Sequence, residues 1–63
     1  MKYKSELNQL IIVANNTLKR KNYTRVIRLE DNRITCDDFS ISPRMSNKLL
    51  KLWLEAFIEG LEF

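Results

Sequence analysis

Two short acidic turns in the middle of the chain restrict what it can fold into. Asp31-Asn32 and Asp37-Asp38 are two-residue loops of the kind that joins neighbouring antiparallel strands. Strands paired around these loops place six apolar side chains on one face of a three-stranded meander, in the pairs Leu29–Ile34, Ile27–Cys36, Cys36–Phe39 and Ile34–Ile41. Because side chains alternate between the faces of a strand, a shift of one residue would move part of this set to the other face. The turns therefore predict one register.

An apolar stripe before the meander predicts a helix from about Ser5 to Lys21. Ser5 is suited to cap its start, and Asn22 is suited to a left-handed stop at its end. The stripe is assigned to the core and consists of Leu7, Leu10, Ile11, Ala14 and Leu18.

A second helix is predicted after the meander, from Ser42-Pro43 to about Glu59. Ser42 would cap the helix, Pro43 would occupy its first position, and Gly60 would close it in a left-handed conformation, with Leu61 and Phe63 folding back. The predicted fold is α+β: a helix, a three-stranded antiparallel meander and a helix (αβββα), with both helices on one face of the sheet. We expect residues 1–63 to form a single domain.

The second helix carries more apolar surface than a small domain needs. Apolar side chains cover roughly two-thirds of its circumference, whereas a surface helix needs a stripe only a little over about 100° wide. We assign to the internal core Leu49, Leu52, Trp53, Ala56 and Phe57. We assign to the interface of a homodimer Leu50, Leu54, Ile58 and Leu61. The alternative is that this helix is the buried centre of the domain, between the first helix and the sheet.

The opposite face of the predicted sheet is polar. Its members are Val26, Arg28, Glu30, Arg33, Thr35, Ser40 and Ser42. Arginine is favoured where carboxylates or phosphates are bound, so we assign partner binding to Arg28, Arg33 and Thr35. The alternative is a solvated face on which Glu30 and Arg33 only pair with each other.

Basic residues gather where the first helix meets the first strand, in a chain whose net charge is +3. They support an alternative function, the binding of nucleic acid phosphates by Lys19, Arg20, Lys21, Arg25, Arg28 and Arg33. The residues at the end of the helix would also complement its dipole without any partner.

Several kinds of chemistry are disfavoured by the residue types present. The chain has no histidine, one cysteine and one glycine, so it lacks a Ser/His or Cys/His pair, a phosphate-binding glycine loop and a cysteine metal site. The aspartates suit turns rather than a calcium loop. We expect a protein that is not an enzyme and that uses no cofactor, metal or small-molecule substrate.

The longest apolar run, Leu10 to Ala14, is far shorter than the roughly 20 residues of a membrane span. No signal-peptide pattern opens the chain, so we expect a cytoplasmic protein that does not bind membranes.

These features favour a small non-catalytic protein-interaction module, a homodimeric regulator or inhibitor of a cellular factor. Phage and mobile-element accessory proteins are often chains of this size that bind a host factor. Double-stranded RNA-binding domains share the element order, but they have a long loop between the first two strands, where this chain has Asp31-Asn32. Topology alone carries no function, so we assign the chain to no family.

Overall fold

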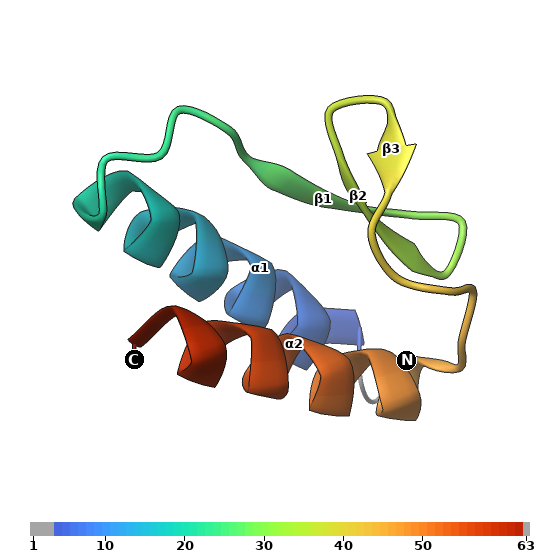
Figure 1. The fold of residues 1–63 in the computed structure, drawn as a ribbon. Coiled ribbons are helices and arrows are strands. Elements are labelled where there is room, and N and C mark those ends of the chain that lie inside the picture. Colours follow the sequence, from blue (N-terminus) through green and yellow to red (C-terminus); the bar gives the residue numbers. More distant parts are fainter. Residues whose placement is uncertain (1–3, 63) are drawn as a thin grey trace.

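The computed structural model describes residues 4–62, which form a helix, a three-stranded antiparallel sheet and a second helix (Figure 1). The elements are α1 (Lys4–Arg20), β1 (Ile27–Glu30), β2 (Arg33–Cys36), β3 (Phe39–Ser40) and α2 (Asn47–Glu62). The strand order is β1-β2-β3, and both helices lie side by side on the same face of the sheet. The predicted αβββα fold is confirmed.

The two turns set three of the four predicted pairs, and the fourth, Ile34–Ile41, is not formed as a strand pair because β3 ends at Ser40. The Cα partners include Leu29–Ile34, Ile27–Cys36 and Cys36–Phe39. Asp31 and Asn32 have φ values of 51° and 56°, and a type I′ turn requires positive φ at both positions. Asp37 also has a positive φ, of 57°. These aspartate and asparagine side chains tolerate the left-handed region, which explains their place in the loops.

The apolar face of the sheet is uncovered at β3. Ile27 and Ile34 are 2% and 0% exposed, but Phe39 is 71% exposed and Ile41 is 38% exposed. β3 is only two residues long and rises away from the helices in Figure 1. The six apolar side chains were predicted to share one face of the sheet, and two of them, Phe39 and Ile41, are exposed because the helix layer covers β1 and β2 only.

α1 ends as its sequence predicts. The Tyr23 N–H donates to the Leu18 carbonyl at 2.9 Å, and the Asn22 N–H donates to the Lys19 carbonyl at 3.0 Å. Asn22 has a φ of 67°, so the end of the helix is a Schellman motif with asparagine in the left-handed position. The buried side chains of α1 are Leu7, Ala14, Thr17 and Leu18.

The outer edge of β1 is closed by a side chain of α1. Asn15 Nδ2 donates to the Ile27 carbonyl at 3.1 Å, and the Ile27 N–H donates to Asn15 Oδ1 at 2.8 Å. The amide therefore satisfies both backbone groups that a further strand would use at this position, and it fixes α1 to the sheet.

The start of α2 differs from the prediction. Ser46, not Ser42, caps the helix: its carbonyl accepts from the Leu50 N–H at 2.9 Å and its hydroxyl accepts from the Leu49 N–H at 3.4 Å. The Ser42 hydroxyl instead accepts from the Ile34 N–H at 2.8 Å, so it satisfies a β2 group beyond the short β3 strand. This role buries Ser42, and its assignment to the polar face is wrong.

The end of α2 also differs from the prediction. Gly60 and Leu61 both lie inside the helix, and Gly60 has no positive φ. The predicted left-handed stop at Gly60 is therefore wrong, and the predicted fold-back of Phe63 lies outside the described residues.

The buried face of α2 is the one that the sequence assigned to a second chain. Leu50 and Leu54 are 0% exposed within this chain, and Ile58 and Leu61 pack against the same core. The dimer-interface assignment is therefore wrong for Leu50 and Leu54, because α1 and the sheet already cover them. The side chains expected in the core that are exposed instead are Leu49, Leu52 and Ala56. Trp53 and Phe57 stack at 5.3 Å beside the core, as expected.

Ion pairs between the helices show that α1 and α2 run in the same direction. Glu6, near the start of α1, lies 3.9 Å from Lys51 of α2. Arg20, at the end of α1, lies 3.2 Å from Glu62 at the end of α2. The helix layer therefore has both helix starts at one end of the molecule and both helix ends at the other.

Candidate functional site

The sheet face that points away from the helices is hollowed and polar. A concavity of about 360 Å³ is lined by Arg28, Glu30, Arg33, Thr35, Asp37, Asp38 and Ser40. A second hollow, of about 280 Å³, shares Arg28 and the Asp37-Asp38 turn with the first. We call these two adjoining hollows the sheet-face site. The structure brings Arg28, Arg33 and Thr35 together in it, because Arg28 lies opposite Thr35 and Arg33 lies two residues before Thr35 on the same strand.

Thr35 is at the centre of the sheet-face site, with Arg28 opposite on β1 and Ser40 opposite on β3. Its side chain is 8% exposed, yet its Oγ1 atom has no hydrogen-bond partner among the residues that the structure describes. A buried hydroxyl left unsatisfied costs about 1–3 kcal/mol, so this group opposes the stability of the isolated chain.

The two arginines of the site are also without polar partners. Arg33 Nε is buried and makes no hydrogen bond within residues 4–62. Arg33 lies opposite Glu30, but the ion pair that was the alternative to partner binding is absent from the described part of the chain. Arg28 likewise makes no ion pair with any described residue. Arg28 is exposed, so its donor groups are open to a ligand, whereas Arg33 Nε is buried and a ligand reaches it only after the side chains above it move.

The charges around the site are balanced. Arg25, just before β1, makes an ion pair with Asp37 at 3.4 Å. Together with Arg28 and Arg33 it gives the face three positive charges, which match the three negative charges of Glu30, Asp37 and Asp38. From the sequence, Asp37 and Asp38 were assigned only a turn. Their position directly after β2 is the signal that they would also border this face.

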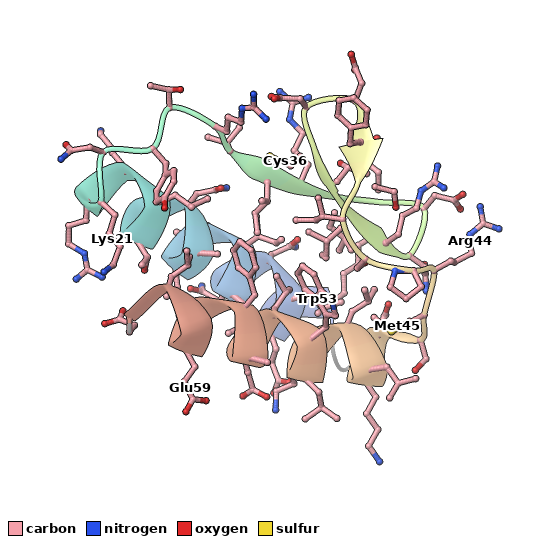
Figure 2. All side chains as sticks on the ribbon, viewed as in Figure 1. Lys21, Cys36, Arg44, Met45, Trp53 and Glu59 are labelled. Atoms are coloured by element: carbon pink, nitrogen blue, oxygen red, sulfur yellow. The ribbon has the colours of Figure 1, made fainter. Side chains whose placement is uncertain are left out.

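The residues assigned to nucleic acid do not form one surface. Lys19 and Arg20 are in the last turn of α1 and Lys21 follows directly after it, in the helix layer, as Figure 2 shows for Lys21. Arg28 and Arg33 line the hollow on the opposite side of the sheet. Arg20 is held by Glu62, and its Nη2 also lies 3.4 Å from the Thr17 hydroxyl. Its guanidinium is therefore already engaged within the chain.

Comparison with known proteins finds no matching family model, no matching curated protein and no matching solved structure. Within residues 4–62, no group of three or more His, Cys, Asp or Glu side chains is placed to hold a metal ion. Neither described helix is long and apolar enough to cross a membrane. Function is therefore inferred from the geometry of the chain itself.

Proposed function

We propose that this protein is a small protein-binding module whose sheet-face site holds an acidic side chain of a partner protein. The observation that carries the proposal is the buried hydroxyl of Thr35, which has no partner in the described chain and lies opposite Arg28 and two residues after Arg33. A group that lowers the stability of the free chain is expected where binding supplies the missing hydrogen bond.

The donors of the site suit a carboxylate. Arg28 and Arg33 present only N–H donors, and the Thr35 hydroxyl can donate its own hydrogen. A carboxylate has two acceptor oxygens, and its hydrogen bonds to guanidinium groups are among the strongest in proteins. An aspartate or glutamate side chain would meet the exposed Arg28 guanidinium first, and it would satisfy the buried Arg33 Nε and Thr35 Oγ1 atoms once the side chains that cover them move aside.

The balanced charge of the face favours a protein over nucleic acid as the partner. A nucleic acid lying along this face would bring its phosphate groups close to Glu30 and Asp38. Neither carboxylate makes an ion pair in the described chain, so both would repel the phosphates. A protein surface can offer charges of both signs, and matched charges set the specificity of an interface. Arg28 and Arg33 would then meet acidic groups while Glu30 and Asp38 meet basic ones.

The edges of the sheet are less suited to a partner than its face. Asn15 occupies the backbone of β1 at Ile27, and β3 is only two residues long. A stable interface buries about 800 Å² on each partner, which is about a sixth of the 4738 Å² surface of this chain. A partner that contacts such an area on the sheet face suits a regulator or inhibitor that acts by occupying a surface of a cellular factor.

The test is an NMR titration of the isotope-labelled chain with N-acetyl-glutamate amide, with N-acetyl-glutamine amide as the uncharged match. We expect the glutamate probe alone to shift the Arg33 Nε–H and Thr35 amide resonances. Arg33→Gln should abolish the response. Thr35→Val should weaken it without lowering thermal stability, whereas Thr24→Val, at an exposed loop position, should change neither.

Two results would overturn the proposal. One is the absence of a response at Thr35 and Arg33 at millimolar glutamate probe. The other is binding of a DNA or RNA duplex that weakens steeply with salt and is lost in the Lys19→Gln/Lys21→Gln double variant, which would establish the nucleic-acid alternative.

A further inference from the structure

The outer side of α2 carries an apolar stripe that no other element of the described chain covers. Leu49 is 50% exposed and Leu52 is 55% exposed, and Ala56 is exposed as well. The three residues follow one another at spacings of three and four, so they share one side of the helix. We call them the outer stripe. It lies on the side of α2 opposite Leu50 and Leu54, which form the core.

The charged residues of α2 are arranged so that they interact unfavourably with the dipole of the helix. A helix favours anions at its start and cations at its end, but α2 has no acidic residue in its first turn and no basic residue in its last. Contacts with α1 account for two of its charges, because Lys51 pairs with Glu6 and Glu62 pairs with Arg20.

Three further charges have no such explanation. No ion pair within the described residues is made by Lys48 at the start of α2, Glu55 in its middle or Glu59 near its end. Lys48 and Glu59 lie about three turns apart, so they share one flank of the outer stripe. Figure 2 shows Glu59 pointing away from the rest of the molecule, while Trp53 lies between α2 and the sheet.

We propose that a second copy of this chain covers the outer stripe, with the two α2 helices packed antiparallel across a two-fold axis. In that arrangement the same flank of each helix meets its equivalent, and the start of one helix lies beside the end of the other. Lys48 of each copy then faces Glu59 of the other, so symmetry forms this ion pair twice. The leucines of the two stripes pack together between these charges.

This dimer is independent of the sheet-face site. The outer stripe lies on the helix layer, and the sheet-face site lies on the other side of the sheet. Two copies joined through α2 would present two sheet-face sites, one on each side of the assembly. Either proposal can fail while the other holds.

The first test is the mass of the full chain by light scattering across micromolar concentrations. We expect about 15 kDa, which is twice the 7.5 kDa of one chain. Leu52→Glu should give a single chain with an unchanged circular dichroism spectrum. Ile12→Glu is the matched control, because Ile12 is 54% exposed on α1, and it should remain a dimer. A wild-type chain that is monomeric throughout, or a Leu52→Glu chain that is still dimeric, overturns the proposal.

Charge reversal tests the orientation of the two helices. Lys48→Glu and Glu59→Lys should each raise the dimer dissociation constant roughly tenfold, because each reversal places two like-charged pairs across the axis. The double variant should return to within about twofold of the wild type, since the attraction is then restored with its signs exchanged. A double variant as weak as the two single variants would show that these residues do not face each other.

Discussion

α1 and α2 have nearly equal lengths, 17 and 16 residues, but they are helical for different reasons. α1 follows the rules that stabilise a helix on its own: Glu6 lies in its first turn, Lys19 and Arg20 lie in its last, and Asn22 ends it. α2 has the opposite charge order and contains Gly60. Its helix is stabilised mainly by the burial of Leu50 and Leu54 against the rest of the chain.

This difference explains why the end of α1 could be predicted from the sequence and the bounds and inward face of α2 could not. Local signals decide where α1 ends, so its end is predictable. The predicted cap, Ser5, is wrong, because Ser5 lies inside the helix, which already includes Lys4. Tertiary contacts decide the start, the end and the inward face of α2. Substitutions in the two helices should therefore act through different physical causes.

The largest effect is expected in the core of α2. Leu54→Glu places a charge in a site that is 0% exposed, and the cost of about 3–5 kcal/mol is comparable with the whole stability of a small domain. We expect loss of helical circular dichroism at 25 °C. Leu52→Glu, two residues away and 55% exposed, should keep the wild-type spectrum. Equal circular dichroism spectra for the two variants would contradict the finding that Leu54 faces the core and Leu52 faces solvent.

A smaller effect is expected at the end of α1. Asn22→Ala forces a Cβ-bearing residue without a compensating polar group into a φ of 67°, at a cost of about 1 kcal/mol. Urea unfolding followed by the fluorescence of Trp53, the single tryptophan, measures the loss. Asn22→Gly is the control and should be at least as stable as the wild type. An alanine variant with unchanged stability would show that the left-handed end does not hold α1.

The smallest effect, opposite in sign, is expected near the end of α2. Gly60 is helical, and an added Cβ would meet no atom within 4 Å, so Gly60→Ala should raise the unfolding free energy by about 0.5–1 kcal/mol. The measurement is thermal unfolding at concentrations where the chain is monomeric. A decrease in stability would indicate that α2 ends before Gly60, as in the sequence-based prediction.

The sheet was largely predictable because its turns act locally. Asp31-Asn32 fixes which residues of β1 and β2 face each other, and that register brings Arg28 and Thr35 onto one face. The exposure of Phe39 was not predictable, because it depends on how far the helix layer extends under β3.

The errors in α2 have a similar origin. Ser42 and Ser46 are both suitable caps, and the short β3 strand decides between them by leaving the Ile34 N–H for the Ser42 hydroxyl. Apolar side chains cover most of the circumference of α2, so the sequence could not show whether Leu50 or Leu49 faces inward.

The residues of the sheet-face site could be predicted from the register of the strands. The burial of the Thr35 hydroxyl could not, because it depends on the packing of the neighbouring side chains.

The side-chain amide of Asn15 has a consequence for how this small sheet behaves in a crowded solution. An unprotected strand border recruits further strands and can grow into cross-β fibrils. Here the amide occupies both backbone groups of Ile27, so a recruited strand would first have to displace it. One polar residue of a helix thereby lowers the risk of fibril growth at the β1 border.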